Sequence, residues 1–561
     1  MANLLINSKK YKIAVVLGEA RKLHMNMADA AASLRHRFRK LSDVIVHRER
    51  DDAAGSRSLS EQMANNADDL PRGGAGERLS STAGARLGEP LTHRLDHVQR
   101  AHRTAMRLFI TVFLTAIASV SPTTNADTSQ SQSAVLYEGA RLIPGDGGPA
   151  IENSAFLVER GVITRIGRRG EIALPAQTVR VDLEGKTVMP TLIDAHGHPG
   201  FQKGLSYVAS NFSYATVIRD LKRALYFGVS TVMSQGIEKG DVTYQVRDAQ
   251  WAGKAGGARL MIAGRGIGAP NAGPGFAAFA GIAYEVTTED EIRRAVRELA
   301  VSKVDGIKIW VDDRGGRAKR LSPPVFRAAI DEGHKQGLKI AAHEFYHVDA
   351  VDLVDAGVDA LLHLVRDEEM SDALISAMVK RGVYVTPNLA AAEYFHKGRP
   401  TDPYLVSMLR ATVPAPELRH LEARAPDPDD PGVRRSLASY ALQSRSMVKL
   451  NAAGARIILG PDTGLEDSFF GYGEHRELDL LAGTGMTPAQ VIVAATSRTA
   501  AYLGLIDTGS LTVGKDADFL VLDANPLEDI RNAHRISKVF IKGVDVDRAA
   551  LSAELLRATD E

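Results

Sequence analysis

Six residues of the types that bind metal ions and move protons recur through the middle of the chain. They are His196, His198, Lys308, His343, His363 and Asp462. The first two end the apolar run that begins at Val188, and one residue separates them. Because residues i and i+2 of a strand point to the same face, both imidazoles can reach one ion. The whole set can hold two divalent metal ions.

Each of the other four residues ends or follows its own short apolar run, such as Leu-Lys-Ile-Ala-Ala before His343 and Val-Asp-Ala-Leu-Leu before His363. A single His or Asp at a strand end is more often a cap or a satisfied polar residue than a metal ligand. Six such residues at corresponding places favour a shared metal site over six unrelated roles.

Composition limits the kind of metal site and the kind of partner. The chain has 561 residues and no cysteine, which excludes disulfides, a cysteine nucleophile and thiolate zinc sites. Nitrogen and oxygen ligands remain, and they suit zinc, manganese or iron. The formal net charge of +1 gives no argument for binding nucleic acid. The length allows a barrel with accessory elements, and the sequence leaves open whether the chain forms a homo-oligomer.

The N-terminal part contains an export signal in an unusual place. Met106-Arg107, the apolar run 108–120 and the small residues before Asp127 have the order of a secretory signal peptide. We therefore predict that 106–126 is a cleaved signal, that translation starts at Met106, and that 1–105 is a disordered, non-native upstream extension. The apolar run is short for a membrane span, so we expect no stable membrane insertion after cleavage. The predicted location is periplasmic or secreted. The alternative interpretation of the apolar segment is a buried core helix of an N-terminal domain.

Two β-rich segments, 127–186 and 506–550, flank a long segment of alternating strands and helices at 187–505. The flanking segments predict a small β-sandwich built from both ends of the mature chain. The middle predicts an α/β fold, a (β/α)8 TIM-type barrel, whose active site would lie at the carboxyl ends of the strands. The eight candidate strands are 187–194, 230–234, 259–263, 306–311, 339–343, 360–364, 383–387 and 456–460. The six residues fall at the ends of five of them.

Two longer connections interrupt this alternation. The glycine-rich segment 264–282 follows the third strand and could fold over the site. Segment 391–430 follows the seventh strand and is predicted to be a solvated insertion or lid.

These motifs resemble the amidohydrolase superfamily, in particular its imidazolonepropionase-like and prolidase-like members. The resemblance covers about 134–545 and includes Pro-Thr-Leu-Ile-Asp-Ala-His-Gly-His, Asp-Gly-Ile-Lys-Ile, Ile-Ala-Ala-His, Asp-Ala-Leu-Leu-His and Gly-Pro-Asp-Thr-Gly. It implies that His196 and His198 bind the more buried metal and that His343 and His363 bind the more exposed one. It also implies that Lys308 is carbamylated and bridges both metals, which are expected to be zinc.

The resemblance implies a metal-dependent hydrolase of carbon–nitrogen bonds, with a dipeptide or N-acyl amino acid as its small-molecule amide substrate. A metal-bridging hydroxide would attack the carbonyl, while Asp462 binds a metal, takes the proton and passes it to the leaving amine. Prolidase-like members often have Tyr two residues after the fifth-strand His, where this chain has Phe345. We therefore consider the neighbouring Tyr346, together with His475, as candidate substrate contacts.

Two other functions remain open on the sequence. One is a mononuclear cyclic-amide hydrolase or deaminase like imidazolonepropionase, against which Lys308 argues because single-metal members usually lack a bridging lysine. The other is a non-catalytic homologue that keeps the barrel as a scaffold, although such proteins generally lose ligands and this chain keeps all six.

Overall fold

The computed structural model describes residues 134–557, except 239, 276–278 and 466–467. The predicted upstream extension 1–105 and signal peptide 106–126 lie outside the described residues. Among the helices that are described, none has the length and apolar character that a membrane crossing requires.

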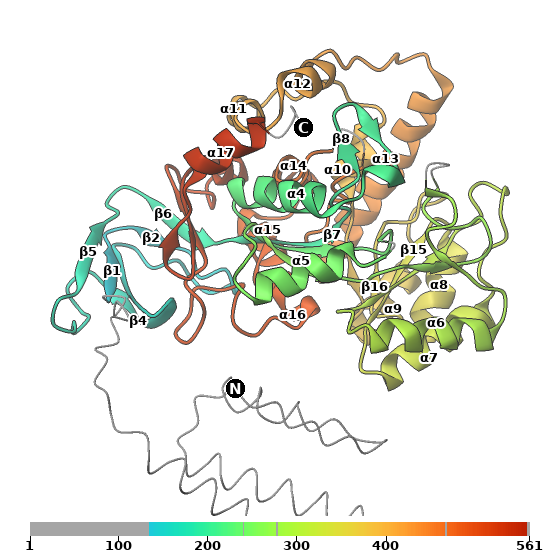
Figure 1. Cartoon of the computed structure of the whole chain (residues 1–561), viewed down its shortest axis with the longest axis horizontal. Coiled ribbons are helices and arrows are strands. Elements are labelled where there is room, and N and C mark those ends of the chain that lie inside the picture. The colour runs from blue at the N-terminus through green and yellow to red at the C-terminus, as the bar shows by residue number, and fades with distance from the viewer. Residues whose placement is uncertain (1–133, 239, 276–278, 466–467, 558–561) are drawn as a thin grey trace, which may run out of the picture. The chain divides into compact units, whose positions relative to one another are not determined.

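Eight parallel strands alternate with helices through the middle of the chain (Figure 1). They are β7 (Leu192–Gly197), β10 (Val229–Ser234), β11 (Arg259–Ile262), β14 (Ile307–Val311), β15 (Ile340–Glu344), β16 (Ala360–Leu361), β17 (Tyr384–Val385) and β18 (Arg456–Ile457). They pair in the orders β11-β10-β7 and β14-β15-β16-β17-β18, and the short β12 (Ile267–Gly268) and β13 (Tyr284–Glu285) extend the second sheet beyond β14.

Backbone contacts join these two sheets at both edges. The Asp305 N–H donates to Ile262 O (2.7 Å), which links β11 to the approach to β14. At the other edge, Ala195 N–H of β7 donates to Leu459 O (2.9 Å), and a parallel bridge pairs Gly197 with Thr463 beyond β18.

The helices begin and end where the sequence offers caps. Helix α6 (Glu289–Val301) starts with a capping box between Thr288 and Glu291, and α9 (Asp372–Arg381) ends at Gly382 in the left-handed conformation. The remaining helices are α4 (Tyr214–Tyr226), α5 (Val242–Trp251), α7 (Pro323–Lys335), α8 (His347–Ala356), α10 (Leu389–Tyr394), α11 (Pro403–Arg410), α12 (Ala415–Glu422), α13 (Pro431–Ala452), α14 (Tyr472–Gly483), α15 (Pro488–Ala495), α16 (Ser497–Leu503) and α17 (Arg548–Arg557).

The segment predicted as a solvated insertion, 391–430, is more ordered than expected. It contains α11 and α12, and their residues Leu405, Leu409 and Leu421 are buried. These apolar side chains recur at helical spacing, which explains why the segment packs instead of remaining a polar lid.

Strands from both ends of the described chain form two further sheets. The first has the order β4-β3-β1-β5 and the second β2-β6-β19-β20-β21. Their bounds are β1 (Val135–Glu138), β2 (Arg141–Leu142), β3 (Ser154–Glu159), β4 (Val162–Arg168), β5 (Val179–Asp182), β6 (Thr187–Pro190), β19 (Phe519–Leu522), β20 (Ile536–Ile541) and β21 (Val544–Asp545). The rings of Tyr137 and Phe156 from the first sheet meet Phe519 of the second, with centroids 5.0 and 5.2 Å away.

The predicted strand 187–194 is two strands in the structure. β6 pairs antiparallel with β19, whereas β7 pairs with β10, so one apolar run serves two sheets. Thr191 lies at the break, where its hydroxyl donates to Ser230 Oγ (2.7 Å). The break could not be predicted, because both halves are fully buried and the apolar run continues on either side of Thr191.

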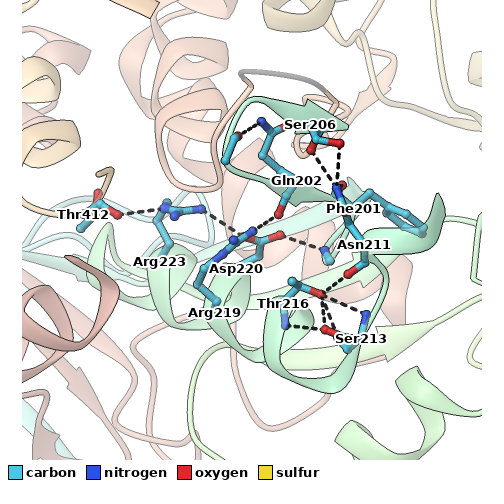
Figure 2. A network of polar contacts seen from close by, with 12 residues as sticks. Phe201, Gln202, Ser206, Asn211, Ser213, Thr216, Arg219, Asp220, Arg223 and Thr412 are labelled. Carbon is cyan, nitrogen blue, oxygen red and sulfur yellow. Dashed lines mark hydrogen bonds and ion pairs between the residues drawn. The ribbon is translucent and has the colours of Figure 1, made fainter. Parts of the chain in front are cut away.

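A buried ionic network holds the chain that follows His198 (Figure 2). The Gly200 N–H donates to Asp220 Oδ2 (2.8 Å), and Asp220 Oδ1 accepts from Arg223 Nη1 and Arg219 Nη2 (both 3.0 Å). Gly200 has φ +102°, and a Cβ there would lie 2.5 Å from Val217, so a side chain does not fit. Helix α4 thereby fixes the segment that leaves the His-x-His pair.

Candidate metal centre and active site

Three of the predicted ligands meet at the ends of β7 and β18. Asp462 Oδ1 lies 3.3 Å from His196 Nε2 and 2.9 Å from His198 Nε2. All three side chains are buried, and one potential ligand atom from each lies within 4.8 Å of the others. Ligands about 2 Å from a tetrahedral ion lie about 3.3 Å from one another. The spacing therefore fits a common divalent cation.

The electrostatics of the cluster also fit a cation. Asp462 Oδ1 is buried and has no hydrogen-bond partner among the described residues, in spite of the nearby imidazole nitrogens. Burial opposes ionisation of this carboxyl, but His196 and His198 outweigh it and hold the pKa of Asp462 well below its usual range. Asp462 also has φ +63°, a conformation that non-glycine residues adopt rarely and often at functional sites.

The other three predicted ligands lie beside this cluster. The ring of His363 is 5.3 Å from that of His196 and 4.3 Å from that of His343, measured between centroids. His363 Nε2 is buried without a partner among the described residues. Burial holds the pKa of His343 and His363 well below the usual range, so both imidazoles are neutral, the form that binds metals.

Lys308 is buried at the same place, with 1 % of its surface exposed. Burial lowers the pKa of its amine to about 7. All six predicted residues line one cavity of about 450 Å³, together with residues of the glycine-rich segment such as Pro274 and Gly275.

His343 is oriented by an acid that the sequence did not single out. Its Nε2 lies 2.9 Å from Asp312 Oδ2, and Arg314 Nη1 donates to the same oxygen (2.9 Å). With Nε2 engaged by Asp312, Nδ1 of His343 is the nitrogen left for a metal. Asp312 follows the strand that carries Lys308 by one residue, but its partner lies 31 residues away.

Two further residues support His196. Asp194 Oδ1 accepts from the His196 N–H (2.8 Å), and Asn388 Nδ2 lies 3.0 Å from His196 Nδ1. Asn388 has φ +55° and also donates to Gly460 O (2.8 Å), which ties β17 to the chain before Asp462. Asn388 is 192 residues from His196 in sequence, so no local pattern could reveal this contact.

The sequence of residues 187–546, well over half of the chain, matches the amidohydrolase family. The chain belongs to this family. It is a hydrolase that acts on carbon–nitrogen bonds.

Individual amidohydrolases extend the likeness beyond that region. The chain is 26 % identical over 450 residues to ochratoxinase from Aspergillus niger, across 73 % of this chain and 85 % of that protein. It is 25 % identical over 417 residues to imidazolonepropionase from Deinococcus radiodurans, across 71 % and 92 %. The crystal structure of a putative prolidase from Bifidobacterium longum is similar with a TM-score of 0.60 and 27 % identity, across 76 % and 99 %.

The two candidate substrate contacts lie elsewhere in this amidohydrolase. The Tyr346 hydroxyl donates to Asp313 Oδ1 (2.8 Å), and the residue that lines the cavity is its neighbour Phe345. His475 is fully buried in α14, where its Nε2 lies 2.8 Å from Phe227 O. Neither position supports the predicted substrate contact. A buried structural His has the same sequence appearance as a site His, so only the fold separates them.

Proposed function

We propose that this amidohydrolase is a binuclear, metal-dependent enzyme that cleaves a C–N amide bond in a dipeptide or an N-acyl amino acid. One observation carries the proposal: the cluster of His196, His198 and Asp462 shares its cavity with Lys308, His343 and His363. In the proposal His196 and His198 hold one ion, His343 and His363 the other, and a carbamate on Lys308 joins the two ligand sets. Zinc suits this donor set.

Two bound divalent ions would supply Lewis-acid character and lower the pKa of water. Asp462 provides the proton transfer. Its carboxylate faces the cavity beside both His-x-His imidazoles, so it can take a proton from the attacking water and deliver it to the leaving nitrogen. Asp312 holds the His343 ring, and Asn388 and Asp194 hold His196, which keeps the ligands in place before substrate arrives.

The carbamate on Lys308 is proposed from its surroundings. A protonated amine has no lone pair for a metal, whereas a carbamate offers two oxygens to ions about 3.5–4 Å apart. Lys308 is buried and lines the cavity together with the other candidate ligands, and its amine forms no ion pair with a carboxylate among the described residues.

We further propose that the eight parallel strands close into a (β/α)8 barrel and that the two outer sheets form one β-sandwich domain, built from the predicted segments 127–186 and 506–550 with β6 (Thr187–Pro190) added. The hydrogen bonds from Asp305 and Ala195 at the two sheet edges support closure. The antiparallel pairing of β6 with β19 and the aromatic contacts between the sheets support the sandwich. Folding of a chain that lacks 506–550 would contradict this assignment.

Export through a signal at 106–126 also stays a proposal. N-terminal sequencing of the native protein should find a mature start at Asp127. A mature start near Ala2 would contradict it.

A second candidate function is the mononuclear hydrolase or deaminase. One observation favours it: only His196, His198 and Asp462, among the described residues, bring their ligand atoms within 4.8 Å of one another. Metal analysis separates the candidates. Protein made with zinc and bicarbonate should contain two ions per chain if the site is binuclear, whereas one ion in both the wild type and Lys308→Ala would favour the mononuclear site.

The proposed reaction is tested on that metal-loaded protein with a panel of dipeptides and N-acyl amino acids. Release of a free amine and a carboxylic acid, lost in Asp462→Asn, is the expected result. Absence of hydrolysis across amides, esters and lactones by fully metallated protein would favour the scaffold alternative.

A further inference from the structure

The metal-site cavity is lined by three arginines, Arg314, Arg317 and Arg366. The same cavity is lined by aromatic and aliphatic side chains, namely Tyr207, Ile237, Trp310, Phe345, Phe395 and Leu465. Its only carboxylates are Asp312 and Asp462 among the described lining residues, and both already serve the metal ligands. The cavity therefore has cationic groups in excess beside an apolar surface.

Arg314 is fully engaged in holding neighbouring chain. Its Nη1 donates to Asp312 Oδ2 (2.9 Å), its Nε donates to Ala272 O (3.3 Å), and its Nη2 donates to Ala272 and Gly273 carbonyls. These contacts fasten the glycine-rich segment 264–282 to the end of β14. Few donors of Arg314 remain for a ligand, so its role is to position this segment.

Arg366 is held equally firmly but keeps a donor free. Its guanidinium stacks on the Phe345 ring (4.7 Å to the centroid), and its Nη2 donates to Glu344 O (2.7 Å). Its Nε is buried and has no partner among the described residues. No carboxylate of a described residue forms an ion pair with Arg366. The two carboxylate oxygens of Glu344 are buried and have no hydrogen-bond partner among the described residues.

Arg366 lies next to one of the proposed metal ligands. Arg366 Nη2 lies 3.2 Å from His343 Nε2, so the guanidinium is adjacent to the metal site. Arg366 also lines the cavity and forms no ion pair with a carboxylate of a described residue, so its guanidinium can take an anionic ligand there. Guanidinium matches the planar, bidentate geometry of a carboxylate better than any other side chain.

We propose that Arg366 is the residue that recognises a free carboxylate on the substrate. This inference rests on the proposed amide hydrolysis and deepens it: the substrate is an amide with an apolar side chain and a carboxylate close to the scissile bond. Substrates of the same shape without the carboxylate bind weakly, because they leave the Arg366 guanidinium without a counter-charge in the cavity.

The test uses metal-loaded full-length protein and three probes that contain one amide each. N-acetyl-L-leucine has the carboxylate on its amine half. The monoamide of succinic acid with 3-methylbutylamine has it on its acyl half, and N-(3-methylbutyl)acetamide has none. Arg366→Met should lower kcat/KM, mainly through KM, by roughly 100-fold for a carboxylate probe and leave the neutral probe within about threefold. Arg366→Lys should recover part of the loss.

Arg317→Met is the matched control, because Arg317 lines the same cavity but is exposed and uses its Nε on Arg314 O (2.8 Å). It should preserve the preference for the carboxylate. The metal content of Arg366→Met should equal that of the wild type, which separates ligand recognition from an effect on His343. Equal losses on charged and neutral probes, or an unchanged preference, would overturn the proposal.

Calorimetry keeps this test independent of the proposed reaction. If the wild type hydrolyses no probe, amide hydrolysis of this class is contradicted. Binding of N-acetyl-L-leucine that is weakened in Arg366→Met and unchanged in Arg317→Met would still support carboxylate recognition.

Discussion

Two buried polar clusters adjoin Pro199 in the sequence: the candidate metal ligands, which include His198, and the network around Asp220, which holds Gly200. They differ in how completely their polar groups are hydrogen-bonded. In the network around Asp220, both carboxylate oxygens accept hydrogen bonds, from Gly200, Arg219 and Arg223 (Figure 2). In the candidate metal cluster, Asp462 Oδ1 and His363 Nε2 are buried without hydrogen-bond partners among the described residues, although Asp462 Oδ1 lies 2.9 Å from His198 Nε2. Buried polar groups are normally paired within the protein, so unpaired ones that converge on a cavity indicate a ligand site. The first cluster holds the backbone and the second is left open for chemistry.

The largest effect is expected from a change in the candidate metal cluster. Asp462→Asn should lower kcat roughly 10³- to 10⁴-fold, because the amide neither accepts the proton nor balances the charge of a cation. Turnover of a responsive amide probe measures the loss, and an unchanged far-ultraviolet circular dichroism spectrum shows that the fold persists. Activity within tenfold of the wild type would mean that Asp462 has no role in proton transfer.

A change in the network around Asp220 should lower the stability of the fold. Asp220→Asn leaves Arg223 buried without its counter-charge, since both side chains are only 3 % exposed. We expect the free energy of unfolding to fall by roughly 3–5 kcal/mol in denaturant titrations. Glu422→Gln removes an ion pair with Arg410 (3.0 Å) in which the two side chains are 36 % and 64 % exposed, and should cost less than about 1 kcal/mol. Similar losses from both variants would remove the distinction between a buried network and a surface pair.

A smaller effect is expected at Asn388, which contacts a candidate metal ligand but is not a ligand itself. Asn388→Ala removes the side-chain contact with His196 Nδ1 and should weaken zinc affinity roughly 10- to 100-fold. Competition with a chromogenic chelator measures the affinity. Wild-type affinity in Asn388→Ala would show that the ring of His196 is positioned without this amide.

The smallest effect is predicted for Tyr346→Phe. Its hydroxyl contacts Asp313 and the residue is not among those that line the cavity, so kcat/KM should change by less than about threefold. Steady-state kinetics on the same probe provide the comparison. A larger loss would restore Tyr346 as a substrate contact.

The sequence predicted the strands well, because strands depend on local patterns, whereas the roles of the six candidate ligands stay predictions. The candidate strands 306–311, 339–343 and 360–364 correspond to β14, β15 and β16, although Lys308 lies near the start of β14, and Lys308, His343 and His363 line one cavity. The α/β alternation was likewise visible from apolar periodicity. Family membership, expected from the same motifs, is confirmed by the match over 187–546.

Features that depend on contacts between distant segments could not be predicted. Asp312, Asn388 and Arg366 are ordinary polar residues in sequence, and only the fold brings them into contact with His343 or His196. His475 shows the converse, since it is buried against Phe227 and is not among the residues that line the cavity. The break at Thr191 arises because two different sheets take up the two halves of one apolar run.

Metal content tests the central claim most directly. The full chain, prepared with zinc and bicarbonate and then freed of loosely bound metal, should contain close to two zinc ions per molecule by elemental analysis. Lys308→Ala should contain at most one. A wild-type zinc content near zero would contradict the claim that the cluster of His196, His198 and Asp462 is part of a metal centre.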